Sequence, residues 1–158
     1  MRREIRPMTV PEIEKWYAEE LAEAFAPAER KPLADILSLR AEGRYELLGL
    51  FNERDELLGY ATIWRQPDGA GLVLLDYLGV SARLRNGGLG AELCAHLARR
   101  YGGQGLILES EAPVPGGSPA ENELRRRRIA FYARNGFQPV YEMGCGGKPC
   151  SGARRPAT

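Results

Sequence analysis

Apolar residues recur along this chain with two kinds of spacing, and their order predicts a sheet flanked by helices. Strands are predicted where apolar residues alternate with polar ones or run together for a few positions. These segments are 4–8, the two arms of 45–64 around a turn at 52–55, 71–80, 106–109 and 137–143. Helices are predicted where apolar residues recur every three or four positions between capping residues and prolines. These segments are 9–26, 32–42, 89–101 and 120–135.

The connections between these segments predict the topology. The short turn inside 45–64 makes its two strands antiparallel neighbours, whereas a helix between residues 80 and 106 implies a parallel pair of strands. The predicted fold class is therefore α/β (α+β) with a mixed, mostly antiparallel central sheet. We expect a single domain over residues 1–143, followed by a tail, 144–158, that is rich in glycine, proline and arginine.

Composition limits the classes of function. The chain has 158 residues, of which 27% are charged, and its formal net charge is +1. Because a dedicated nucleic-acid-binding domain is usually strongly basic, we expect no nucleic-acid partner. The N-terminus lacks the apolar segment of a signal peptide, and no apolar run approaches the roughly 20 residues that span a bilayer. We therefore expect a cytoplasmic protein without a membrane partner.

The stretch "RNGGLG", residues 85–90, lies between an apolar strand and an amphipathic helix. A helix N-terminus presents unpaired N–H groups and a partial positive charge, both of which suit a phosphate. Glycine lets the backbone come close to such a ligand, but it also fits a tight turn that binds nothing. The stretch has neither the dinucleotide fingerprint nor a P-loop lysine. The residues alone leave an anion site and a plain turn as equal interpretations.

The same stretch resembles the Arg/Gln-x-x-Gly-x-Gly/Ala signature of the GNAT superfamily of N-acetyltransferases. About 40 residues later, "RIAFYARNGF" is similar to a second signature of that family, Phe-Tyr-x-x-x-Gly-Phe. The order of the predicted elements also agrees from the first strand to the sixth. The resemblance implies an acyl-CoA N-acyltransferase fold, with helices on both faces of a sheet that is splayed between its fourth and fifth strands.

The resemblance further implies acetyl-CoA as cofactor. Backbone N–H groups of the glycine turn would hold the diphosphate, and exposed backbone of the fourth strand would pair with the pantetheine arm. In this chain the turn positions are Arg85, Asn86, Gly87, Gly88, Leu89 and Gly90, and the strand positions are Leu78, Gly79 and Val80.

Acetyl transfer to an amine needs a base, a hydrogen-bond donor for the developing oxyanion and a proton for the departing thiolate. Tyr132 stands where the family often carries the general acid, although a core aromatic residue would fit there too. The backbone N–H of Val80 or of a neighbouring residue is the expected oxyanion donor. Glu109 is the expected base, because it shares one strand face with Glu111, lies deeper, and would have a raised pKa if partly buried. Asp76 is the alternative base, or a structural acid paired with an arginine of the last helix.

Other reactive residues change this interpretation little. Cys145 and Cys150 have the spacing of half a zinc site, but the chain offers no second pair of ligands, so we expect no metal. His96 is expected at the flank of its helix. The run Arg125–Arg128 points around a helix rather than to one side, and one or two of its members could reach a cofactor phosphate, Asp76 or Glu109.

The family usually has a seventh strand beside the fifth, yet no apolar run remains after residue 143. The strand is short and polar, missing, or supplied by a partner chain. An unpaired strand edge favours association, so a homodimer is a possibility.

The sequence thus predicts an N-acetyltransferase that moves an acetyl group from acetyl-CoA directly to a primary amine, in a small molecule or in a peptide or protein. The alternative is a non-catalytic acyl-CoA-binding sensor or regulatory module. A nucleic-acid-associated factor that uses the arginine run fits the near-neutral charge least well.

Overall fold

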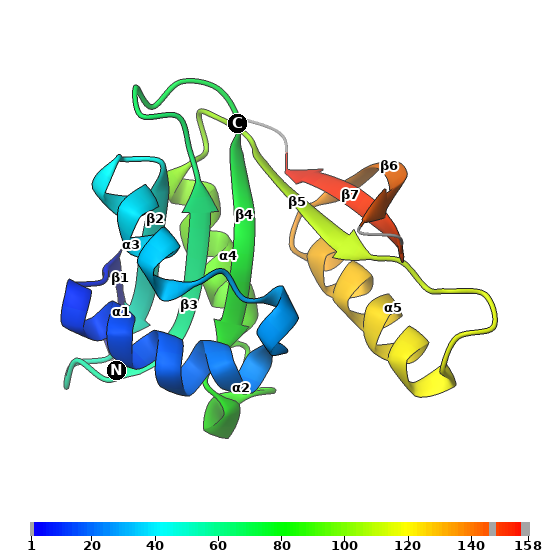
Figure 1. Cartoon of the computed structure of the whole chain (residues 1–158), viewed down its shortest axis with the longest axis horizontal. Helices are drawn as coiled ribbons and strands as arrows, with labels where there is room; N and C mark the ends of the chain where they lie inside the picture. Colours follow the sequence, from blue (N-terminus) through cyan, green and yellow to red (C-terminus); the bar gives the residue numbers. More distant parts are fainter. Residues whose placement is uncertain (1, 146–147, 156–158) are drawn as a thin grey trace.

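The computed structural model describes residues 2–145 and 148–155, with the backbone alone for 140–145 and 148–155. Seven strands of the described residues form one sheet in the order β1-β2-β3-β4-β5-β7-β6 (Figure 1). The strands are β1 (Glu4–Pro7), β2 (Tyr45–Phe51), β3 (Leu57–Trp64), β4 (Val73–Val80), β5 (Leu106–Glu111), β6 (Gln138–Cys145) and β7 (Lys148–Arg155). The helices are α1 (Val10–Trp16), the π-helical segment Tyr17–Leu21, α2 (Ala22–Ala24), α3 (Leu33–Ala41), α4 (Leu89–Arg100) and α5 (Pro119–Arg134), with 3₁₀ turns at Pro27–Glu29 and Ala82–Leu84.

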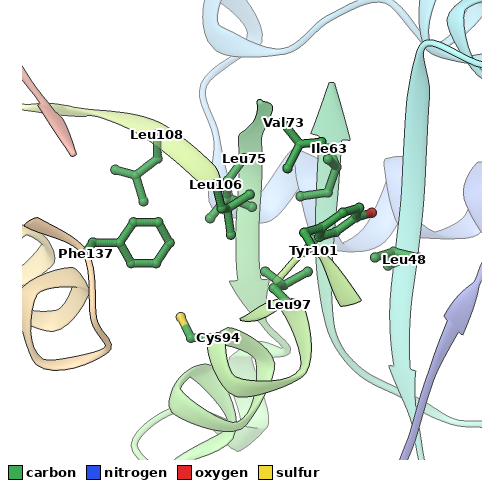
Figure 2. Packing of buried hydrophobic residues seen from close by; sticks show 11 residues of the cluster. Leu48, Ile63, Val73, Leu75, Cys94, Leu97, Tyr101, Leu106, Leu108 and Phe137 are labelled. Atoms are coloured by element: carbon green, nitrogen blue, oxygen red, sulfur yellow. The ribbon is translucent and has the colours of Figure 1, made fainter. Parts of the chain in front are cut away.

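Helices cover both faces of the sheet, which confirms the predicted fold class (Figure 1). On one face, Ile13, Trp16 and Ile36 from the first helices pack against tyrosines of the strands. On the other face, Leu97 and Cys94 of α4 pack against strand residues, as Figure 2 shows. Full burial of one such apolar side chain contributes about 1.5–3 kcal/mol, so these two layers hold the sheet between them.

Only β4 and β5 run parallel, and their pairing is short. It joins Val73–Leu75 to Leu106–Leu108, after which the two strands diverge (Figure 1). β4 continues along β3 as far as Val80, while β5 continues along β7 as far as Glu111. Among the described strands, β4 therefore has no partner along one edge after Leu75. This is the predicted splay.

A β-bulge interrupts the pairing of β3 with β4. Ile63 lies opposite Leu75, and Thr62 lies opposite Tyr77, so Asp76 has no partner on β3. The extra residue changes which face the β4 side chains reach: Leu75 joins the core under α4, whereas Tyr77 joins the core under the first helices. The backbone N–H of Tyr77 donates instead to the hydroxyl of Thr62, at 3.0 Å. Bulges of this kind often occur beside active sites.

A π-helical segment interrupts the first long helix. Trp16 and Leu21 are both buried although they are five residues apart. In a regular α-helix such a pair would point to different sides, but hydrogen bonds from residue i+5 to i bring the two side chains onto one face. The single predicted helix over 9–26 is thus α1, the π segment and α2 in sequence.

The seventh strand lies within the segment that the sequence predicted to be a tail. β7 is inserted between β5 and β6 and is antiparallel to both. Backbone hydrogen bonds to two neighbours hold it there, which is why a polar, glycine-containing segment forms a strand without an apolar run. A homodimer was a possibility on the condition that β5 lacked a neighbour from its own chain. That condition is not met, since β7 of the same chain covers this edge.

No helix among the described residues is long and apolar enough to cross a lipid bilayer.

Candidate active site

A pocket of about 530 Å³ lies where β4 and β5 diverge. Its walls come from α2 and the chain after it, from β4, from β5 and from α5. It brings together several of the residues predicted for cofactor binding and catalysis, which are Leu78, Gly79, Val80, Arg85, Glu109 and Tyr132. Residues far apart in the sequence thus meet at the splay of the sheet.

The glycine turn leads from β4 into α4 and has the backbone geometry of a close-approach loop. Asn86 and Gly88 both have positive φ angles, of 68° and 80°. Gly88 is the N-cap of α4, and no side chain caps the helix there. The N–H groups of the first helical turn have no partner within a helix, so they remain available to an anion. Residues 86–90 lie outside the lining of the pocket, whereas Arg85 is part of it.

Gly90 has a different reason to be glycine. A Cβ atom at Gly90 would lie 3.0 Å and 3.2 Å from two ring atoms of Phe131 on α5. The last glycine of the signature therefore lets α4 and α5 approach each other closely. Structural packing explains this position without any ligand.

Arg85 forms an ion pair across the pocket mouth. Its Nη2 lies 2.6 Å from Oε2 of Glu23, which belongs to α2, and both side chains are nearly half exposed. An ion pair this exposed contributes at most about 1 kcal/mol to stability. It ties the glycine turn loosely to the first helices.

Tyr132 lies between the pocket and the core. Its ring packs edge-on against Phe131 and Phe137, with centroids 5.3 Å and 5.5 Å away. Burial raises the pKa of the Tyr132 hydroxyl to about 12. The phenol is therefore protonated at neutral pH and can act as a hydrogen-bond or proton donor.

The two glutamates of β5 differ in their surroundings. Glu109 lines the pocket but is exposed, so the partial burial on which a raised pKa would depend is not present. Glu109 follows Leu108, the last residue of β5 that pairs with β4, so it lies where the two strands have begun to diverge. Glu111 also lines the pocket, and its Oε2 accepts a hydrogen bond of 3.0 Å from Arg125. Of the two, Glu109 is the more open to a solvent molecule or a substrate.

Asp76, the residue of the bulge, also lines the pocket. Its Oδ2 accepts hydrogen bonds from Nζ of Lys31, at 2.6 Å, and from the Tyr45 hydroxyl, at 2.5 Å. The expected arginine partner is therefore wrong: the partner is a lysine from the chain between α2 and α3. Only a long-range contact could reveal this, because the two residues are 45 positions apart.

The arginine run is divided among several partners. Arg125 pairs with Glu111 and Glu121, while Arg126 and Arg127 pair with Glu123. Arg128 reaches the pocket lining, which agrees with one member of the run lying near the site.

His96 stands at the side of α4, beside Arg99, and burial together with that guanidinium lowers the pKa of its imidazole. Among the described side chains no group of three or more metal-binding residues occurs. The side chains of Cys145 and Cys150 lie outside that part of the structure.

Carboxylates dominate the pocket lining. Five of them face two guanidinium groups, and the carboxylates are Glu23, Glu29, Asp76, Glu109 and Glu111. Glu29 and Phe25 also line the pocket, and neither was predicted as a site residue. No local pattern marks these two residues, because they lie in an irregular connection.

Comparisons with known proteins agree with this arrangement. A family model for the acetyltransferase (GNAT) domain matches residues 45–139, from β2 into the start of β6. Among curated protein sequences, none matches this chain.

Solved structures share the fold over nearly the whole chain. A protein from Bacteroides thetaiotaomicron assigned to the GNAT family is 24% identical, with a TM-score of 0.74 over 96% of this chain and 86% of that one. The ribosomal-protein-S18-alanine N-acetyltransferase from Escherichia coli is 20% identical, with a TM-score of 0.70 over 99% and 95%. An aminoglycoside 6′-N-acetyltransferase complexed with coenzyme A is 15% identical, with a TM-score of 0.68 over 96% and 95%.

Proposed function

We propose that this chain, which belongs to the GNAT family of acetyltransferases, transfers an acetyl group directly from acetyl-CoA to a primary amine. The observation that carries the proposal is the pocket at the splay of β4 and β5, where a tyrosine, a carboxylate and an open strand edge meet. Members of the family use acetyl-CoA, and it is the cofactor of this chain.

The described residues fit that cofactor in two places. The first turn of α4, entered through Gly88 with a φ of 80°, offers uncapped N–H groups that suit a diphosphate. The edge of β4 from Leu78 to Val80 has no strand partner on the β5 side, so its backbone groups can pair with an amide-bearing chain. When bound, acetyl-CoA supplies an acetyl group activated as a thioester.

Tyr132 is the proposed proton donor for the departing sulfur. A phenol whose pKa is about 12 stays protonated throughout the neutral range, so it enters the reaction carrying its proton. The backbone N–H of Val80 is the proposed donor to the carbonyl oxygen, where negative charge develops.

Glu109 is the proposed base. An amine attacks only in its neutral form, and Glu109 is an exposed carboxylate on the pocket wall that can accept a proton directly or through water. Asp76 is less suited to this role, because one of its oxygens already accepts from Lys31 and Tyr45.

The acceptor is proposed to reach the pocket as a cation. With the ion-pair partners Lys31 and Arg125 counted, the five carboxylates of the lining face four cationic side chains, and this excess of negative charge favours a positively charged amine over an anionic molecule. Small polyamines, aminoglycosides and peptide N-termini all present such a group.

A cytoplasmic location of the protein stays a prediction.

The experiment is a thiol-release assay with acetyl-CoA and a panel of amines. The panel contains 1,4-diaminobutane, kanamycin, a peptide with an N-terminal alanine and a lysine-containing peptide with a blocked N-terminus. We expect amine-dependent release of coenzyme A with at least one of them, and its loss in Glu109→Gln. Tight binding of coenzyme A without release on any amine would instead favour the non-catalytic sensor. Absence of any affinity for coenzyme A would refute both functions.

A further inference from the structure

One wall of the pocket is an irregular stretch of chain fixed to β4 by side chains. We call residues 23–31, from the end of α2 to the start of the chain leading into α3, the wall segment. Glu23, Ala24, Phe25 and Glu29 of this segment line the pocket. The segment has little regular structure of its own, only the end of α2 and one 3₁₀ turn at Pro27–Glu29. Its position must therefore depend on contacts with the rest of the fold.

Tyr77 makes the first set of contacts. Its hydroxyl donates a hydrogen bond of 2.9 Å to the carbonyl of Glu29 and accepts one of 3.0 Å from the backbone N–H of Lys31. Its ring packs against Phe25, with the centroids 5.0 Å apart. From the other side, the hydroxyl of Tyr17 donates to the carbonyl of Lys31 at 2.7 Å. Two tyrosines thus hold the backbone of the wall segment at its C-terminal end, and Phe25, near the other end, packs against the ring of Tyr77.

The ion pair of Lys31 with Asp76 makes the second contact. The side chains are only 28% and 20% exposed, and the lysine ammonium also lies 5.2–5.9 Å from the ring centroids of Tyr45, Trp64 and Tyr77. An ammonium among aromatic faces and beside a carboxylate is held by both attractions together. The pair therefore fastens the end of the wall segment to the middle of β4.

The β-bulge explains why both anchors occur at this point. Side chains of successive strand residues normally point to opposite faces. Here Asp76, which lies opposite no residue of β3, interrupts the alternation. Asp76 and Tyr77 both contact the wall segment. Tyr45 completes the arrangement: its one hydroxyl proton goes to Asp76, so the hydroxyl of Thr62, 2.8 Å away, donates to Tyr45.

We propose that Lys31 and Asp76 are positioning residues for the acceptor side of the pocket: their ion pair holds the wall segment against the bulge of β4 and so sets where Phe25 and Glu29 meet the incoming amine. The inference rests on the proposed function. The glycine turn and the β4 edge, which are assigned to acetyl-CoA, are formed without either residue.

The test compares Lys31→Met with a matched control, Arg65→Met. Arg65 forms a similar ion pair with Glu46, with side-chain exposures of 31% and 19%, but neither residue lines the pocket. Three quantities are measured for both variants: the Kd of coenzyme A, the kinetics with the most active amine of the panel, and hydrogen exchange of peptides covering the wall segment. Lys31→Arg, which keeps a cation, and the double variant Lys31→Met/Asp76→Asn complete the set.

We expect Lys31→Met to raise the KM of the amine at least tenfold, to change the Kd of coenzyme A less than twofold, and to speed exchange in the wall segment. Arg65→Met should change none of the three. Lys31→Arg should restore most of the amine KM, and the double variant should be no worse than Lys31→Met alone, because both lose the same contact.

Two results would overturn the inference. One is an unchanged amine KM in Lys31→Met although the wild-type enzyme turns over. The other is equal damage to the amine KM and to coenzyme A binding, which would indicate general destabilisation. If wild-type protein released no thiol with any amine, the proposed function would fail instead. Hydrogen exchange would still decide whether the ion pair orders the wall segment, because unchanged exchange in Lys31→Met refutes it.

Discussion

Replacement of Gly88 by leucine should separate the role of the glycine turn in binding from its role in folding. Gly88 has a φ of 80°, and no heavy atom lies within 4 Å of the position that a Cβ atom would take. A Cβ atom at this position therefore meets no neighbour, and we expect the cost to folding to be mainly backbone strain of roughly 1–2 kcal/mol. For a domain of this size that cost lowers Tm by roughly 2–8 °C.

The effect on cofactor binding should be larger than the effect on folding. The leucine side chain would project into the open space at the first turn of α4, where the diphosphate is proposed to bind. Loss of one charge-assisted hydrogen bond costs about 1.5–3 kcal/mol, so the Kd of coenzyme A should rise at least tenfold. Isothermal titration calorimetry measures the Kd, and thermal unfolding measures Tm.

Gly43→Leu is the matched control. Gly43 also has a positive φ, of 75°, and open space around its Cβ position, but it follows the C-terminal end of α3 and so does not lie at a helix N-terminus. We expect the same loss of Tm and no change in the Kd of coenzyme A. If both variants bound coenzyme A as the wild type does, the assignment of the diphosphate to this helix would be wrong.

Three further predictions follow from single contacts. Tyr132→Phe should lower kcat at least tenfold, measured by thiol release, and change the Kd of coenzyme A less than twofold, measured by calorimetry. Unchanged turnover would leave Tyr132 as a packing residue only. Gly90→Val should destabilise the fold by about 1–3 kcal/mol in chemical denaturation, because the new side chain presses on Phe131, and Phe131→Leu in the same chain should recover part of that loss. Hydrogen bonds from Arg6 lower the pKa of the Glu12 carboxyl to about 2. The stability that this carboxylate adds should therefore be complete above its ordinary pKa of 4.5 and disappear as the pH falls towards 2. The Tm difference between wild type and Glu12→Gln should be present at pH 6 and absent at pH 2.

The elements that the sequence predicted well are those whose signals are local. The helix over α4 was visible because Leu89, Leu93 and Leu97 recur every four residues, and all three are buried. The hairpin of β2 and β3 was visible because polar residues separate two apolar runs. The two signatures placed the glycine turn and Tyr132 correctly on their elements, because each signature lies within a few residues of one turn or helix.

Two irregularities escaped the pattern because they alter its period. Trp16 and Leu21 are five residues apart, a spacing that matches neither the α-helical nor the strand period. Five residues is the hydrogen-bond spacing of the π turn that lies between them. Asp76 was noticed as an acid in an apolar strand, but its meaning depends on the pairing with β3, which leaves it out of register. A single segment cannot reveal the register of its neighbour.

β7 escaped for a different reason. An interior strand usually shows an apolar run, but this one reads "KPCSGARR". Its place in the sheet comes from backbone hydrogen bonds to β5 and β6, and backbone groups are the same in every sequence apart from proline. Side-chain patterns alone therefore left three alternatives open, and the structure agrees with the first of them, a polar seventh strand of the same chain, rather than with a missing strand or one supplied by a partner chain.

The two sides of the pocket differ in how their geometry is encoded. On the cofactor side, positive φ angles at Asn86 and Gly88 and the start of α4 occur within one short stretch, so a local signature suffices to identify it. On the acceptor side, the wall segment is held by Lys31–Asp76 and Lys31–Tyr77 contacts that span about 45 residues of sequence. Substitution of Lys31 or Asp76 removes a contact in which no residue of the glycine turn takes part, whereas Glu23 of the wall segment does pair with Arg85. This separation explains why a short signature points to the proposed acetyl-donor side, whereas the proposed acceptor side depends on contacts between distant segments.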